Sequence, residues 1–284
     1  MNVQELLQTL DGYFRNNQVD MVEPFLLNHL NRATAAQDHP ATLTILNELM
    51  GFYRGMSRTT EAVAVAQRAL NLLETLGYQG SVPYATTLLN AATAYRADGQ
   101  TSRAIDAYDQ VMSIYTANKV EDPYLVASLY NNMSIAYQEL GDHARATNYL
   151  QRALPLVKTI PGGEADVAVT YTNLAHSKIK GGRLADARED LLEAVRLFES
   201  QSHINPHYGA ALAALGEIAF RQQDMQHAIG YYERALAAIE AHYGKNMYYA
   251  VTLESLAVVL EDIDAARSAN LKDEAVRIQA SFKH

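Results

Sequence analysis

Three asparagines recur at nearly equal intervals and are the side chains in this sequence best suited to binding chemistry. Asn132 follows Asn90 by 42 residues, and Asn173 follows Asn132 by 41. A side-chain amide both donates and accepts hydrogen bonds, so a row of amides can hold the backbone of an extended peptide without reading its side chains. The same amides could instead serve only to bond a neighbouring helix. The sequence leaves both interpretations open.

Helical spacing extends this row of asparagines into a wider surface. Residues three and seven positions further along a helix share one face with the asparagine position. That face includes Thr93, Glu139, His176, Lys180, Glu217 and Arg221. Lys180 and Arg221 are placed to meet an acidic side chain or a peptide carboxylate, although plain solvated charge is the alternative. His176 is interpreted as a polar residue able to bond a ligand, not as a catalytic group.

The sequence offers little that could carry a reaction. It contains no HExxH, GxSxG, GxGxxG or phosphate-loop motif. It has no cysteine, which excludes disulfides, thiolate zinc sites and cysteine nucleophiles. His203 and His207 have a helical spacing, but the Asn205-Pro206 pair between them indicates a helix start, so we interpret them as loop residues. We therefore predict no enzyme activity, no cofactor and no metal site.

Charge and N-terminal composition narrow the class of partner. The 284 residues include 32 acidic and 23 basic side chains, for a formal charge of −9. This balance argues against general nucleic-acid binding, which needs clustered Lys and Arg. The N-terminal segment has no basic stretch followed by a long apolar run, so we predict neither a signal peptide nor a membrane span. We expect a cytoplasmic protein without nucleic-acid or membrane partners.

The residues named above lie in an internal repeat of 41 to 42 residues. The segment that begins at Leu89 matches the segment that begins at Asn131, and this match places Gly99 and Gly141 42 residues apart. One alanine position recurs in five successive units, at Ala62, Ala104, Ala146, Ala187 and Ala228. Such a period predicts stacked supersecondary units, none of which can bury its apolar face alone.

Each unit is predicted to contain two helices. Prolines suit the first position of the first helix, where the missing N–H would be unpaired anyway. They occur at Pro40, Pro83, Pro123 and Pro206. The first helix is expected to end at a left-handed glycine, namely Gly99, Gly141 or Gly182. The second helix is expected to start at a capping residue such as Thr101 or Asp142.

Small and aromatic residues at equivalent positions predict how the helices pack. The first helices place a small residue where a neighbour crosses closely, at Ala92, Ser134, Ala175, Gly216 and Ala257. Tyr53, Tyr95 and Tyr137 recur at a position that we interpret as core. Lys178 and Ala219 replace that tyrosine in later units.

These residues resemble the tetratricopeptide repeat family, most fully over Ala91 to Val111 and Met133 to Ala153. The period of 41 to 42 is similar to that of kinesin light chains and related bacterial proteins. The resemblance implies an all-α fold, a right-handed α-solenoid of about seven antiparallel helix pairs whose first helices line a concave groove. It also implies peptide binding by asparagines at the repeated position. The two-carboxylate clamp of chaperone-binding relatives needs a lysine on the opening repeat, where this chain has Thr44 and Glu48.

We expect a single repeat domain over 1–284. It would comprise an N-terminal capping pair over 1–38, core repeats over 40–243, and a C-terminal pair and cap over 246–284 that is irregular between Ile263 and Asn270. Leu6, Leu10 and Phe14 form one apolar stripe at the first end, and Leu271, Ala275, Ile278 and Phe282 form another at the last.

The functional prediction is a non-catalytic protein–protein interaction scaffold that binds a peptide or an extended protein segment in its concave groove. The alternative is a regulatory receptor for a short signalling peptide that acts through a protein partner. In either case we expect a monomer or a homodimer.

Overall fold

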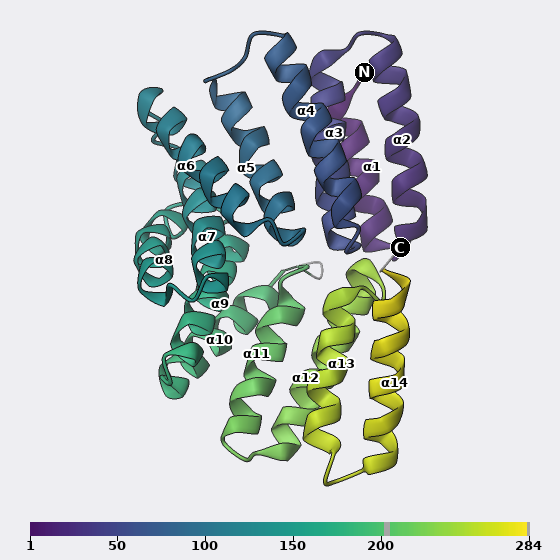
Figure 1. The fold of residues 1–284 in the computed structure, drawn as a ribbon, viewed down its shortest axis with the longest axis vertical. Coiled ribbons are helices and arrows are strands. Elements are labelled where there is room, and N and C mark those ends of the chain that lie inside the picture. The colour runs from purple at the N-terminus through teal and green to yellow at the C-terminus, as the bar shows by residue number, and fades with distance from the viewer. Residues whose placement is uncertain (202–204, 283–284) are drawn as a thin grey trace. The chain divides into compact units, whose positions relative to one another are not determined.

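The computed structural model describes residues 1–201 and 205–282, and this part of the chain contains 14 α-helices and no β-strand. The fourteen helices in this part of the chain match the number that the seven predicted helix pairs require. The chain divides into two compact units, Met1–Gly141 and Asp142–His284 (Figure 1). Each unit stacks its own helices in chain order.

The first unit holds seven helices. They are α1 (Val3–Arg15), α2 (Val19–Ala35), α3 (His39–Gly55), α4 (Thr59–Thr75), α5 (Val82–Ala97), α6 (Thr101–Ala117) and α7 (Pro123–Glu139). The first helices of successive pairs touch each other as well as their own partners, since α5 contacts both α3 and α7. Side chains standing on α3, α5 and α7 can therefore meet.

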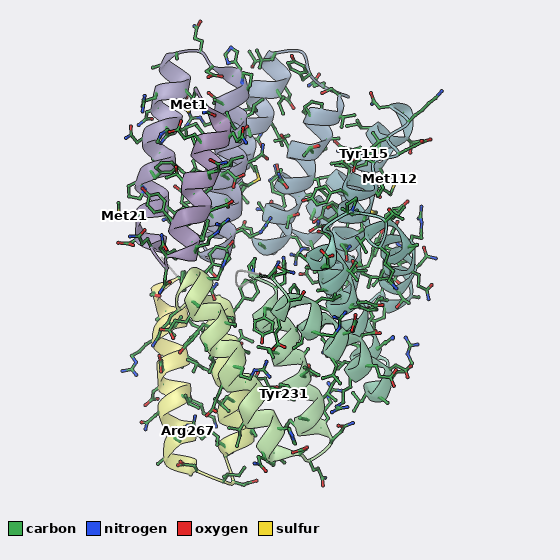
Figure 2. All side chains as sticks on the ribbon, turned by 180° about the vertical axis from the view of Figure 1, so that it is seen from behind. Met1, Met21, Met112, Tyr115, Tyr231 and Arg267 are labelled. Carbon is green, nitrogen blue, oxygen red and sulfur yellow. The ribbon has the colours of Figure 1, made fainter. Side chains whose placement is uncertain are left out.

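The second unit holds the other seven. They are α8 (His143–Val157), α9 (Glu164–Lys180), α10 (Leu184–Glu199), α11 (Tyr208–Arg221), α12 (Met225–Tyr243), α13 (Met247–Leu260) and α14 (Ala265–Ser281). Here α11 contacts both α9 and α13, which repeats the arrangement of the first unit. Side chains fill the space between the helices of each unit, as Figure 2 shows around Tyr115 of α6 and Tyr231 of α12.

The turns inside the pairs confirm the predicted glycines. The φ angles of Gly99, Gly141 and Gly182 are 77°, 77° and 75°. In the turn after α5, the N–H of Gln100 donates to the carbonyl of Tyr95 at 2.8 Å, which satisfies a carbonyl at the end of the helix. The left-handed region is costly for residues with a Cβ, which is why glycine is favoured there.

The predicted helix starts are partly confirmed. Asp142 caps α8, because its Oδ1 accepts from the N–H of Arg145 at 3.0 Å. The prediction that Thr101 caps the second helix was wrong, because Thr101 is the first residue of α6. Its hydroxyl donates to Glu139 Oε2 at 3.2 Å. Gln100 occupies the N-cap position, and the next repeat offers the carboxylate to which the Thr101 hydroxyl donates.

The prolines behave as predicted in three of four places. Pro40, Pro83 and Pro123 lie in the first turn of α3, α5 and α7. The prediction that Pro206 starts a helix was wrong, because α11 begins only at Tyr208. The side chain of Asn205 accepts from the N–H of His207 at 2.9 Å, and this bond holds a turn ahead of the helix. His203, the other member of the histidine pair, lies outside the described residues.

The core contains the residues predicted for it. The five repeated alanines of the second helices have no exposed surface, and Tyr53, Tyr95 and Tyr137 are buried. At Gly216, an added Cβ would lie 3.0 Å from the ring of Tyr232. The position accepts only a very small side chain, because α12 brings that ring against the backbone of α11.

At the position where earlier repeats have tyrosine, Lys178 forms an ion pair. Its Nζ lies 2.6 Å from Asp190 Oδ2 on α10, and both side chains are largely buried. Burial raises the pKa of Asp190, although Lys178 acts to lower it. A paired charge thus occupies a place that an aromatic ring fills in the first unit.

The two ends differ slightly from the prediction. Leu6 and Leu10 are buried in α1, while Phe14 is half-buried. The predicted irregularity between Ile263 and Asn270 was wrong, because α14 is regular from Ala265 onward and is capped by Asp264. The side chain of Asp264 accepts from the N–H of Arg267 at 3.0 Å, so an ordinary cap begins the helix.

Candidate functional site

In the first unit, the repeated asparagine position forms a bond between helices. Asn90 of α5 donates from Nδ2 to Asn47 Oδ1 of α3 at 2.8 Å. Asn47 in turn donates to the carbonyl of Leu43 at 3.0 Å and lies 3.4 Å from the hydroxyl of Thr87. Both amides are half-buried. Their orientation is fixed by these partners, and Oδ1 of Asn90 accepts no hydrogen bond from the described residues.

A second polar cluster connects α5 to α7. The hydroxyl oxygen of Thr93 lies 3.3 Å from Asn132 Oδ1 and 3.4 Å from the phenolic oxygen of Tyr108, and it donates to the carbonyl of Leu89 at 3.0 Å. Asn132 donates to the carbonyl of Ser128 at 2.9 Å. The amide of Asn132 is half-buried and retains hydrogen-bonding capacity, since such a group offers two donors and two acceptor lone pairs.

Glu139 is already engaged within the protein. Its carboxylate lies 2.5 Å from Arg96 Nη1 of α5 and also accepts from the hydroxyl of Thr101. We call the row of Asn47, Asn90, Thr93, Asn132 and Glu139 the polar seam of the first unit. Asn90 and Asn132 can bond a neighbouring helix and still bind a ligand. Each side-chain amide has more donor and acceptor positions than its bonds within the polar seam occupy.

In the second unit, the predicted residues lie on the touching helices α9 and α11. Asn173 is buried, so less of its amide is open than at Asn90 or Asn132. Glu217 accepts from Arg221 Nη2 at 2.5 Å, one helical turn away. Lys180 is exposed and has no ion pair with any residue in the described ranges.

Burial and nearby charges shift the pKa values of His176 and Tyr232 in this part of the second unit. Burial lowers the pKa of His176 below its ordinary value of 6.5; Glu217 opposes the shift and Lys180 adds to it. The imidazole is therefore neutral near pH 7. Burial, and then the charge of Glu217, raises the pKa of Tyr232 to about 12. The phenol stays protonated beside the glutamate.

Two tyrosines that the sequence analysis did not identify lie on second helices and approach predicted binding residues, one in each unit. Tyr108 of α6 and Tyr232 of α12 are 124 residues apart, which is three repeats of 42, 41 and 41. The residues that they approach, Thr93 and Glu217, are separated by the same distance in sequence. Aligning the second helices in the same register as the first would have revealed this pairing. Asn47 was missed because the 42-residue period places Glu48, and not Asn47, at the position equivalent to Asn90.

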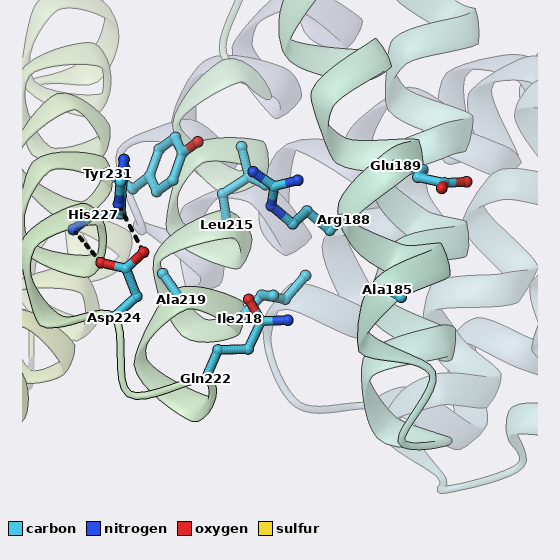
Figure 3. A pocket seen from close by; sticks show the side chains of 10 residues that line it. All are labelled: Ala185, Arg188, Glu189, Leu215, Ile218, Ala219, Gln222, Asp224, His227 and Tyr231. Carbon is cyan, nitrogen blue, oxygen red and sulfur yellow. Dashed lines mark hydrogen bonds and ion pairs between the residues drawn. The ribbon is translucent and has the colours of Figure 1, made fainter.

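Two cavities lie away from the predicted residues. One, of about 350 Å³, is lined by α10, α11 and α12 and contains Arg188, Leu215, Asp224, His227 and Tyr231 (Figure 3). His227 Nδ1 lies 2.7 Å from Asp224 Oδ2 at its edge. The other, of about 720 Å³, is an open hollow between the start of α5 and α6. None of the predicted binding residues lines either cavity.

Two classes of feature are absent from residues 1–201 and 205–282. No group of three or more His, Cys, Asp or Glu side chains is arranged to hold a metal ion. None of the helices in these ranges combines the length and apolar character needed to cross a membrane.

Solved structures of known proteins share this fold. Similarity is found to NprR in complex with its cognate peptide NprX, with a TM-score of 0.71 and 13% identity over 99% of this chain and 79% of that one. It is also found to a Rap protein complexed with Competence and Sporulation Factor, with a TM-score of 0.67 and 17% identity over 99% and 88%. A putative kinesin light chain of Podosopora anserina, with nearly identical TPR-like repeats, gives a TM-score of 0.51 and 22% identity over 72% and 96%.

Sequence comparison identifies the family directly. No curated protein matches the chain. The family profile described as Tetratricopeptide repeat matches residues 41–117 and 125–200, which together exceed half of the chain, and a second profile of the same description matches 172–242. The matched ranges include the polar seam and the charged residues of α9 and α11. The chain therefore belongs to the tetratricopeptide repeat family.

Proposed function

We propose that this protein is a non-catalytic interaction scaffold that binds a peptide, or an extended segment of a protein, on the face formed by its first helices. The observation that carries the proposal is the bond between Asn90 and Asn47, which fixes a half-buried amide and leaves one of its acceptors unused. A side chain that is already oriented loses little entropy when it binds. Asn132, held by Thr93 and Ser128, has the same character.

Extended peptides match this arrangement chemically. Their backbone presents one N–H and one C=O per residue, and an amide side chain can bond to both. Periodic amides would therefore bind the backbone of a peptide without strict dependence on its sequence. The fold shared with NprR and the Rap protein, each solved with a bound peptide or factor, supports the same class of ligand.

A second candidate is a receptor for a short signalling peptide that acts through a protein partner. The likeness to NprR and the Rap protein over nearly the whole chain favours it over other regulatory roles. In this case peptide binding would change the affinity for a third protein. Both candidates use the same amides, and both place the protein in the cytoplasm as a monomer or homodimer without nucleic-acid or membrane partners.

The direct test is selection of random 12-residue peptides displayed on phage, using the full chain as bait. Fluorescence anisotropy then measures the affinity of the selected synthetic peptides for the wild type and for the Asn90→Ala, Asn132→Ala double variant. Each lost bond at a partly buried site is worth about 1–3 kcal/mol, so the dissociation constant should rise at least tenfold.

The matched control is the Asn28→Ala, Asn71→Ala double variant. Both residues are exposed on the second helices α2 and α4. This variant should bind as the wild type does. Failure to select any peptide, or equal affinity of the two double variants, would contradict the proposal.

The two candidates are separated by a partner experiment. Proteins that co-purify with the chain are identified by mass spectrometry, with and without saturating selected peptide. A general scaffold should lose those partners that use the peptide site. A receptor should gain or lose a partner that still binds the Asn90→Ala, Asn132→Ala variant, because that partner uses another surface.

A further inference from the structure

In the second unit, an arginine joins two successive repeats. Arg234 of α12 donates from Nη2 to Glu199 Oε1 of α10 at 2.6 Å and to the phenolic oxygen of Tyr208 of α11 at 2.8 Å. The hydroxyl of Tyr208 donates to the same carboxylate oxygen at 2.7 Å. The carboxylate and the phenol thus form a site for one guanidinium, and Arg234 fills it.

The first unit repeats the carboxylate and the phenol of this site. Tyr84 of α5 lies 124 residues before Tyr208. Glu74 of α4 lies 125 residues before Glu199, which is also the separation of the repeated alanines on the same two helices. The hydroxyl of Tyr84 donates to Glu74 Oε1 at 3.2 Å, as in the second unit. The pair that binds a guanidinium in the second unit is therefore present in the first.

The arginine itself has no counterpart in the first unit. The equivalent residue, 124 positions before Arg234, is the uncharged Gln110 of α6. Gln110 and Tyr84 line the open hollow of about 720 Å³ between α5 and α6, and no Lys or Arg of the described residues lines it with them. The exposed carboxylates of Asp106 and Asp109 line the same hollow. The hollow thus offers acceptors for a guanidinium without supplying one.

The two walls of the hollow are fixed to each other. Asn118, just after α6, donates from Nδ2 to the carbonyl of Gly80 in the turn before α5, at 3.0 Å. Ser81 caps α5, and its hydroxyl oxygen accepts from the N–H of Tyr84 at 3.3 Å. Ile114 lines the hollow as well and offers apolar surface to the methylene groups of a long cationic side chain. A preformed site of this kind loses little entropy on binding.

We propose that this hollow binds an arginine side chain of a partner polypeptide, whose guanidinium takes the place beside Glu74 and Tyr84 that Arg234 takes in the second unit. The guanidinium has further N–H groups that can donate to Asp106 or Asp109. Arginine is favoured over lysine because its planar group donates to a carboxylate and a phenol in fixed directions. No residue of the polar seam lines the hollow, so the inference goes beyond the proposed function and does not depend on it.

The test selects random 12-residue peptides on phage with the Asn90→Ala, Asn132→Ala double variant as bait, in which the polar seam is impaired and the hollow is unchanged. Selected peptides should be enriched in Arg relative to the unselected library. Each is synthesised with Arg, with Lys and with citrulline, which keeps the shape of arginine without its charge. In fluorescence anisotropy, citrulline should raise the dissociation constant about tenfold, and Lys should also raise it.

Two further substitutions in the same bait locate the bound arginine. Gln110→Arg should fill the hollow from within, and Glu74→Gln should remove its carboxylate, so each should weaken binding about tenfold. The loss caused by citrulline should also shrink in Glu74→Gln, because the charged partner is gone. The controls are Gln151→Arg on α8 and Asp20→Asn on α2, which make the same charge changes at exposed positions outside the hollow. Circular dichroism checks that each variant is folded.

Three results would overturn the inference. The first is a selection that yields no peptide, or peptides without enrichment in Arg; the proposed function would stand, because the bait lacks the amides on which that function depends. The second is unchanged affinity in Gln110→Arg, which would place the peptides on another surface. The third is an equal loss in Gln110→Arg and Gln151→Arg, which would show general charge repulsion. Conversely, wild-type-selected peptides that tolerate the double variant but lose affinity in Gln110→Arg would contradict the proposed function and support the arginine site.

Discussion

Asn90 on α5 donates a 2.8 Å hydrogen bond to Asn47 on α3, so two successive repeats are joined by their amides on the face proposed to bind peptides. This hydrogen bond stabilises the packing of α3 against α5, and it also orients the side-chain amide of Asn90. Replacing Asn47 with Ala should lower the free energy of unfolding by about 1 kcal/mol, because Asn90 loses its partner in a half-buried place. Urea unfolding followed by circular dichroism measures this change. Asn28→Ala, on the exposed side of α2, should lie within about 0.5 kcal/mol of the wild type.

Gly216 and Gly230 form a matched pair for packing in the second unit. Gly216→Ala places a Cβ 3.0 Å from the ring of Tyr232, and we expect a loss of about 1–3 kcal/mol. Gly230 lies inside α12 with nothing within 4 Å of an added Cβ. Gly230→Ala should stabilise the protein by about 0.5–1 kcal/mol through helix propensity. Equal effects of the two substitutions in thermal unfolding would show that α11 and α12 do not pack as described.

The ion pair of Lys178 and Asp190 should behave as a unit. Lys178→Met leaves a largely buried carboxylate without its partner and should cost about 2 kcal/mol. The double variant Lys178→Met, Asp190→Leu should recover most of this loss, because an apolar pair can replace the ion pair. A double variant no more stable than Lys178→Met in urea unfolding would contradict the pairing.

Glu48 should make stability fall as pH rises. Burial, and then the charge of Asp11, raises the pKa of Glu48 above its ordinary 4.5 in the folded protein. The folded state therefore holds a proton that the unfolded state releases, so stability declines as pH rises from about 4.5 through the folded pKa. Glu48→Gln should be more stable than the wild type at pH 7, with the gain disappearing at pH 4. The gain should also shrink in an Asp11→Asn background, and a gain that is the same at both pH values would refute the account.

The repeat period made the fold predictable, whereas contacts between repeats escaped prediction. Gly99, Gly141 and Gly182 could be assigned because a left-handed turn has few alternatives to glycine. Thr101 was misassigned as a cap because its true partner, Glu139, lies 38 residues away and becomes a neighbour only when the repeats stack. Asp190, the partner of Lys178, lies on the next helix of the same pair, and the contact depends on how α9 and α10 pack, which spacing alone does not give.

The candidate site shows the same limit. Sequence spacing placed Asn90, Thr93 and Asn132 on one face, but it could not tell whether their side chains bond a neighbouring helix. Distances answer that question for Asn90 and show that one acceptor remains unused. The support of Thr93 by Tyr108 requires knowledge of how deeply α6 packs under α5, which no spacing rule supplies.

The central claim is that peptides bind on the first helices, and photo-crosslinking tests it most directly. A selected peptide carrying a diazirine side chain is bound to the full chain, irradiated, and the attachment sites are mapped by mass spectrometry. The account predicts crosslinks on the first helices, to α5 and α7 or to α9, α11 and α13, and their loss when unlabelled peptide competes. Crosslinks confined to second helices such as α4, α6, α10 and α12 would contradict it.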